Sequence, residues 1–245
     1  MKASILIIGL LTLIHTTFAQ TPQVPAKMKF ADLQLTITKA TRHKIQKEVD
    51  KLRKNNFYFQ KYVEKADLYF PVIEEAFREE GCPDEIKYLM IQESGFNAVA
   101  VSSSNAVGYW QFKKATGIEV GLKIANGIDE RKSIKSASHG AGIYMFKNNK
   151  RINNWIYTVM AYNTGVGGAQ THIKDKYRNA KKMEIGTSTH WYVIKFLAHK
   201  IAFEQEIGTK AHKQKLLIVT AKGGQTVKQI AKKHKVTVEA AKPFN

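Results

Sequence analysis

The sequence predicts an all-α fold for most of the chain, followed by a small α+β module at the C-terminal end. Apolar residues recur at helical spacing between residues 41 and 207, whereas alternating strand patterns are rare before residues 216–220. The chain has 245 residues, which is enough to bury one substantial core and to leave room for a small second unit.

The first 19 residues have the three-part layout of a secretory signal peptide. Lys2 supplies a charge, residues 5–14 are apolar, and residues 17–19 offer a cleavage site before Gln20. About ten apolar residues are too few to span a bilayer, which requires roughly 20. We therefore expect residues 1–19 to be removed on export, with cleavage after Ala19.

Residues 20–58 are expected to form an N-terminal spacer and a first helix. Apolar residues at helical spacing predict helices over residues 41–54, 59–66 and 71–77. Pro71 suits the first turn of the third of these helices, and Gly81 is placed to cap its C-terminus.

The next helix is expected to begin at Asp84 and to run into Glu93, with an inward apolar face formed by Ile86, Leu89 and Met90. Small residues then dominate residues 98–108. Further helices are expected over residues 135–149, 153–163, 169–177 and 190–207.

Residues 216–245 differ in character and are interpreted as a separate module. Residues 217–219 are strand-like, Gly223 and Gly224 indicate a turn, and residues 226–234 have helical spacing.

The formal net charge is +19, and it remains +18 once Lys2 leaves with the signal. Such a charge implies polyanionic surroundings, and export makes the cell wall the simplest of these. The basic residues are spread along the chain, so no nucleic-acid partner is expected. Cys82 is the only cysteine, which excludes an internal disulfide.

Glu93 is the strongest candidate for acid–base chemistry. It ends a helix with a buried apolar face, so it should emerge from the core beside the following loop. The negative end of the helix dipole and partial desolvation both raise the pKa of such a carboxyl group. Glu93 is therefore suited to act as a general acid near neutral pH. The alternative is a solvated glutamate with no chemical role.

Residues 102–108 have little side-chain bulk, so their backbone suits the wall of a groove for an extended ligand. Gln111 can hydrogen-bond an acetamido group. Trp110 and Tyr109 can stack on sugar faces or, equally well, pack in the core. The eight histidines show no metal-ligand spacing, so neither a metal nor another cofactor is expected.

Taken together, these motifs resemble the soluble lytic transglycosylase family, and most closely its membrane-bound transglycosylase D type. The similarity covers roughly residues 59–203. It rests on Gln92-Glu93-Ser94-Gly95-Phe96, Ala106-Val107-Gly108-Tyr109-Trp110-Gln111-Phe112, Ile128-Asp129-Glu130-Arg131, Ala161-Tyr162-Asn163-Thr164-Gly165 and Thr189-His190-Trp191-Tyr192-Val193. Tyr109, Thr164 and Asn105 depart from the family pattern, which bears on subsite preference.

The resemblance implies a lysozyme-like helical domain over residues 59–210. This domain would cleave the β-1,4 bond between N-acetylmuramic acid and N-acetylglucosamine of peptidoglycan strands without water, giving 1,6-anhydromuramyl products. Glu93 would be the sole acid and base. The residues implied at the substrate are Ser94, Trp110, Gln111, Tyr162 and Asn163. Residues 219–245 are similar to a LysM module, which binds glycans. The implied location is the periplasm or cell envelope, with peripheral association.

Two other readings stay open. A goose-type lysozyme-like hydrolase would need a second carboxylate to position water, and Asp129 and Glu130 are the nearest candidates in sequence. In a non-catalytic wall-binding protein, Glu93 would be structural only.

Overall fold

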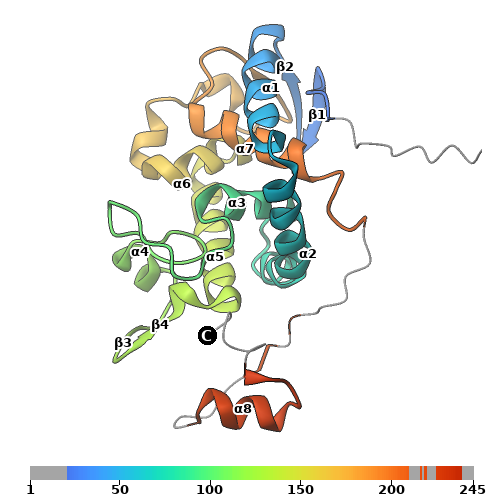
Figure 1. The fold of residues 1–245 in the computed structure, drawn as a ribbon. Coiled ribbons are helices and arrows are strands. Elements are labelled where there is room, and N and C mark those ends of the chain that lie inside the picture. Colours follow the sequence, from blue (N-terminus) through green and yellow to red (C-terminus); the bar gives the residue numbers. More distant parts are fainter. Residues whose placement is uncertain (1–20, 210–215, 217, 220–224, 239–245) are drawn as a thin grey trace, which may run out of the picture.

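The computed structural model describes residues 21–209, 216, 218–219 and 225–238, and the signal peptide expected at residues 1–19 lies outside the described residues. The prediction of a mostly helical fold is confirmed (Figure 1). The α-helices are α1 (Lys39–Arg53), α2 (Asn56–Glu79), α3 (Leu89–Glu93), α4 (Lys114–Glu119), α5 (Ile134–Ile152), α6 (Trp155–Gln170), α7 (Trp191–Phe203) and α8 (Val227–Lys233). Short 3-10 helices lie at η1 (Asp84–Tyr88), η2 (Glu130–Lys132) and η3 (Asp175–Tyr177).

Two small β-sheets interrupt the helices. The prediction of only a spacer and a helix over residues 20–58 is wrong, because two strands of the first sheet lie there. Strands β1 (Lys27–Phe30), β2 (Leu33–Ile37) and β5 (Lys182–Ile185) form one sheet, in which β2 is antiparallel to β1 and parallel to β5. Strands β3 (Ile124–Ala125) and β4 (Ile128–Asp129) form a hairpin at the opposite end of the molecule (Figure 1). Alternate residues of β2 are buried, as a sheet with one covered face requires.

The helical core forms where α2 packs on α5 and α1 packs on α7. Side-chain oxygens of Thr38 and Asn55 cap the N-termini of α1 and α2. Pro71 does not begin a helix as expected, because α2 continues through it. Phe70 and Ile73 are buried on both sides of the proline, and this burial offsets the backbone hydrogen bond that proline cannot make.

The later helices differ from the prediction mainly at their ends. The helix expected over residues 169–177 is wrong, since those residues contain only the end of α6, a loop and η3. Gly165 breaks the helical geometry inside α6 with φ 70°. Near the C-terminus, Thr226 and Gln229 form a capping box at the start of α8, while Ile218 and Val219 belong to no strand.

Candidate active site

Glu93 is the last residue of α3, as the sequence predicted. The chain enters this helix through η1, and Ile86, Leu89 and Met90 are fully buried, so α3 is fixed in the core. Figure 1 shows α3 near the middle of the molecule, between α2, α5 and α7. The core therefore delivers the carboxyl group of Glu93 to the start of the loop that follows.

The carboxyl group of Glu93 is partly buried and hydrogen-bonded. Burial raises its pKa above the usual value for glutamate. The hydroxyl group of Tyr192 donates a hydrogen bond to Glu93 Oε1, which favours the carboxylate and opposes part of that rise. The net direction is upward, so Glu93 holds its proton at a higher pH than a solvated glutamate does.

Two tyrosines stay protonated around this carboxyl group. Burial raises the pKa of Tyr192 and of Tyr162 well above the ordinary value, and the charge of nearby Glu93 raises both further. Both hydroxyl groups are therefore hydrogen-bond donors at any physiological pH. Tyr162 donates to the backbone oxygen of Trp110 (2.7 Å) and so ties α6 to the loop that follows Glu93.

The turn after Glu93 is narrow. Gly95 has φ 58°, and a Cβ atom there would lie 2.6 Å from a ring carbon of Tyr62, so a larger residue would be strained and would displace that ring. The hydroxyl group of Ser94 donates to the backbone oxygen of Tyr109 (2.7 Å). Ser94 therefore fixes the loop beside Glu93, and its hydroxyl group is directed at that loop.

Residues 97–112 form a compact loop held by backbone contacts. Gly108 has φ 81°, and a Cβ atom there would lie 2.0 Å from the backbone oxygen of Arg131. The amide nitrogen of Gln111 donates to the backbone oxygens of Ala100 (3.2 Å) and Gly108 (2.9 Å). These bonds orient the side chain of Gln111, which remains partly exposed.

Trp110 belongs to the core, and the expectation that it stacks on a sugar is corrected by its burial. Its exposed fraction is 0%, and its indole N–H donates to Ser138 Oγ (3.0 Å). Tyr109 is buried as well. Both rings thus follow the packing alternative that the sequence left open.

Asn163 lies close to the end of the helical part of α6, two residues before the break at Gly165, and its side chain is exposed. Tyr162, next to it, points inward, where its ring contacts those of Phe112 and Tyr144. The structure therefore brings Glu93, Tyr162 and Tyr192 together and leaves Asn163 on the surface nearby.

The two acidic residues considered as water-positioning groups have other partners. Asp129 accepts two hydrogen bonds from the guanidinium group of Arg131 (2.9 and 2.7 Å), and these bonds hold its pKa below the usual value. Glu130 accepts hydrogen bonds from the backbone N–H of Lys123 (2.7 Å) and the hydroxyl group of Ser136 (3.4 Å). Both carboxylates thus stabilise the base of the β3–β4 hairpin.

Sequence reasoning did not select Tyr192 as a site residue. Its bond to Glu93 joins residues that are 99 positions apart, and it depends on how α7 packs on α3. The available signal was the segment Thr189-His190-Trp191-Tyr192-Val193, in which Tyr192 is the one phenol.

Comparisons with known proteins show which family this part of the chain is similar to. Residues 70–185 match the family model described as the Transglycosylase SLT domain. Membrane-bound lytic murein transglycosylase D from two strains of Escherichia coli, K12 and O6:H1, is 30% identical over 161 residues. These residues are 63% of this chain and 36% of the relative, so the chain spans about a third of the length of the relatives it matches.

Among solved structures, lytic transglycosylase Slt from Pseudomonas aeruginosa matches with a TM-score of 0.44 and 18% identity, covering 55% of this chain and 24% of that one. The family model and the curated relatives carry the assignment. The chain has a transglycosylase SLT domain at residues 70–185 and is homologous to the membrane-bound lytic murein transglycosylases D.

Proposed function

We propose that this chain cleaves peptidoglycan strands as a lytic transglycosylase, with Glu93 as its single acid and base. The observation that carries the proposal is the carboxyl group of Glu93, whose pKa is raised by burial and which receives a hydrogen bond from Tyr192. A carboxyl group that is protonated near neutral pH can donate to a glycosidic oxygen.

The reaction has two proton transfers. Protonated Glu93 donates to the oxygen that links N-acetylmuramic acid to N-acetylglucosamine, and the bond from the muramyl C1 to that oxygen breaks. The acetamido group of the substrate stabilises the positive charge that develops at C1. Glu93, now a carboxylate, takes the proton from the muramyl 6-hydroxyl group, whose oxygen attacks C1. A 1,6-anhydro ring forms, and Glu93 is protonated again.

The neighbours of Glu93 have distinct roles in this proposal. Tyr192 stabilises the carboxylate that forms between the two steps. Gln111 is oriented by its two backbone bonds and can accept a hydrogen bond from an acetamido N–H. Ser94 and Tyr162 hold the loop and the end of α6 around the substrate, and exposed Asn163 supports the same face.

A transglycosylase needs no second catalytic carboxylate, whereas a goose-type hydrolase would need one to position water. Asp129 and Glu130 are the two candidates for that second carboxylate. Asp129 is bonded to Arg131 and Glu130 to Lys123, and these bonds favour the transglycosylase because they occupy both carboxylates.

Product analysis of purified sacculi tests the proposal. We expect 1,6-anhydromuramyl ends by mass spectrometry from the wild-type chain and none from Glu93→Gln, which should still bind sacculi. Glu119→Gln is the matched control, since Glu119 is an exposed residue of α4 whose partner is Lys147. Reducing ends would identify a hydrolase, and intact strands with the wild-type chain would identify a wall-binding protein.

We infer that the catalytic unit extends beyond the SLT match, over residues 59–210, because Tyr192 on α7 contacts Glu93.

The name of the relatives and the signal-like residues 1–19 support export to the periplasm or cell envelope, with peripheral association. Within the described residues, no helix combines the length and apolar character that crossing a bilayer requires. The capped helix α8 is compatible with a LysM-like module over residues 216–245.

A further inference from the structure

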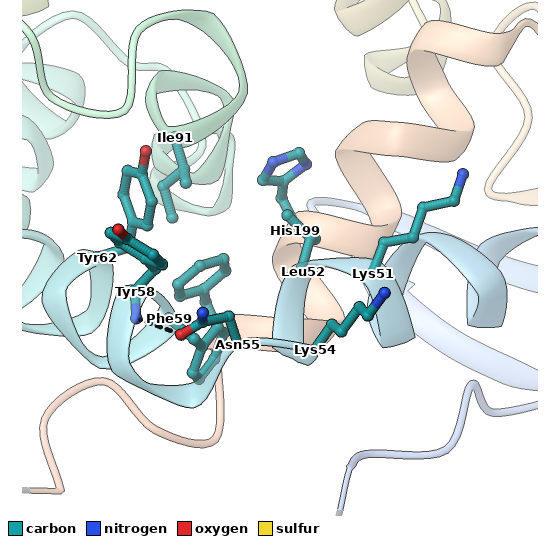
Figure 2. A pocket seen from close by; sticks show the side chains of 10 residues that line it. Lys51, Leu52, Lys54, Asn55, Tyr58, Phe59, Tyr62, Ile91 and His199 are labelled. Atoms are coloured by element: carbon teal, nitrogen blue, oxygen red, sulfur yellow. Dashed lines mark hydrogen bonds between the residues drawn. The ribbon is translucent and has the colours of Figure 1, made fainter.

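A pocket of about 550 Å³ opens between the end of α1, the start of α2 and α7, and it does not include Glu93 (Figure 2). Of the ten residues around it, only Ile91 lies within the SLT match at residues 70–185. The chain therefore builds this pocket mainly from helices that flank the matched domain.

The wall of the pocket suits a ring-shaped polar ligand. Tyr58 and Tyr62 are 60% and 39% exposed, and they stand together on one side of the pocket in Figure 2. Leu52, Ile91 and Phe203 add apolar surface to the lining of the same pocket. Exposed aromatic rings in an apolar pocket can stack on the C–H faces of sugars, which are less polar than sugar edges.

His199 faces the two tyrosines from the other side of the pocket (Figure 2). Its Nδ1 donates to the backbone oxygen of Lys195 (2.8 Å), and burial lowers its pKa to about 4. The ring is neutral at pH 7, so Nε2 is a hydrogen-bond acceptor. A ligand at this point must supply a hydroxyl or amide N–H.

The edge of the pocket is basic. Lys51 and Lys54 line it, and Lys61 and Lys65 follow on the adjoining turns of α2. The other three lysines have partners: Lys51 pairs with Glu48 (2.6 Å), Lys61 lies over the ring of Phe57 (4.2 Å) and Lys65 donates to the backbone oxygen of Gly95 (3.3 Å). Lys54 is therefore the cation of this edge best placed to meet a ligand. A carboxylate on the ligand would complement it.

Helix α7 connects this pocket to the candidate active site. Tyr192 contacts Glu93, and His199 lies seven residues further along α7. Seven residues are close to two helical turns, so the two side chains share one face about 10.5 Å apart. The pocket and the hydroxyl group that contacts Glu93 therefore belong to the same face of α7.

We propose that this pocket is an accessory site for an acidic amino sugar, the N-acetylmuramic acid of a peptidoglycan strand, whose ring stacks on Tyr58 and Tyr62 and whose carboxylate meets Lys54. The sugar hydroxyl or acetamido N–H donates to His199. The identity of the ligand rests on the proposed function, but the pocket is tested by binding and not by cleavage.

The experiment is a calorimetric titration of the full chain carrying Glu93→Gln, which prevents turnover. The two probes are a peptidoglycan tetrasaccharide with free muramyl carboxylates and neutral tetra-N-acetylchitotetraose. Adding Lys54→Glu should weaken binding of the acidic probe about fivefold, equal to about 1 kcal/mol, and leave binding of the neutral probe unchanged. Tyr58→Ala should weaken the binding of both probes, whereas Tyr58→Phe, which keeps the ring, should bind them as Tyr58 does. Added salt should reduce the effect of Lys54→Glu.

Lys47→Glu on α1 is the control, because it makes the same charge change at an exposed position outside the pocket. Equal effects of Lys47→Glu and Lys54→Glu, or no effect of Lys54→Glu, would overturn the accessory site. The proposed function has its own test, which is the kind of glycan end that the wild-type chain produces. Selective loss of binding with Lys54→Glu, found together with a wild-type chain that leaves sacculi intact, would support the pocket and end the proposed function.

Discussion

Replacing Tyr192 by phenylalanine removes one hydroxyl group and leaves a ring of nearly the same volume in α7. The lost bond runs from Tyr192 to Glu93 Oε1. A hydrogen bond to a charged group contributes about 1.5–3 kcal/mol and a bond to a neutral group about 0.5–1.5 kcal/mol. The variant thus loses about 1–1.5 kcal/mol more from the carboxylate than from the protonated acid, which predicts a kcat lower by about 5- to 13-fold.

The pH profile shows whether Tyr192 acts through Glu93. The Tyr192 bond lowers the pKa of Glu93, so its removal raises that pKa. Because the first step needs protonated Glu93, the alkaline limb of kcat/KM should move to higher pH. The assay is release of anhydromuropeptides from sacculi across neutral and alkaline pH. An alkaline limb that stays in place or moves to lower pH would refute the reasoning.

Tyr157→Phe is the matched control, since it removes a partly buried hydroxyl group whose partner is the backbone N–H of Lys174. This variant should keep the wild-type pH profile. A change of the same size in both variants would mean that loss of any tyrosine hydroxyl group disturbs the fold.

Three further changes have defined outcomes. The pKa of Glu93 is higher in the folded than in the unfolded chain, so the wild type loses stability as pH rises from the ordinary glutamate range through that pKa. Glu93→Gln should therefore raise the melting temperature measured by circular dichroism at pH 8 and leave it without a gain at acidic pH. Gly108→Ala puts a Cβ atom 2.0 Å from a backbone oxygen at φ 81°, and it should lower the free energy of unfolding in urea by about 2–4 kcal/mol. Gly127→Ala has φ 78° but nothing within 4 Å of the new Cβ atom, and it should lower that free energy by only about 1–2 kcal/mol. Trp110→Phe removes the indole N–H that donates to fully buried Ser138, so it should lower the free energy of unfolding by about 2–4 kcal/mol and leave KM unchanged. A raised KM at unchanged stability would instead place Trp110 at the sugar site.

The helices were predictable because their signal is local and repeats along each helix. The strands were not, because β2 has only five residues and its parallel partner β5 lies about 150 residues later in the chain. Pro71 misled the prediction for the opposite reason. A strong local rule for proline was outweighed by burial of α2 on both sides of it.

The same distinction separates the parts of the candidate site. Glu93 could be selected from its own segment, because a buried face followed by a glycine turn places it at the edge of the core. Trp110 could not be assigned, since a tryptophan next to a glutamine fits a sugar platform and a core equally well until its burial is known. Tyr192 needed the packing of α7 on α3, which no local pattern contains.

The position of Tyr192 also bears on what makes Glu93 an acid. The SLT match ends at residue 185, yet the donor that stabilises the Glu93 carboxylate comes from α7, which begins at residue 191. Helix α7 is in turn packed against α1, which precedes the match. Burial alone would hold the proton on Glu93 and hinder its release, whereas a two-step reaction needs both protonated and ionised forms. In the proposed reaction the helices outside the match therefore take part in the acid–base chemistry, because they supply the hydroxyl group that makes the ionised form accessible.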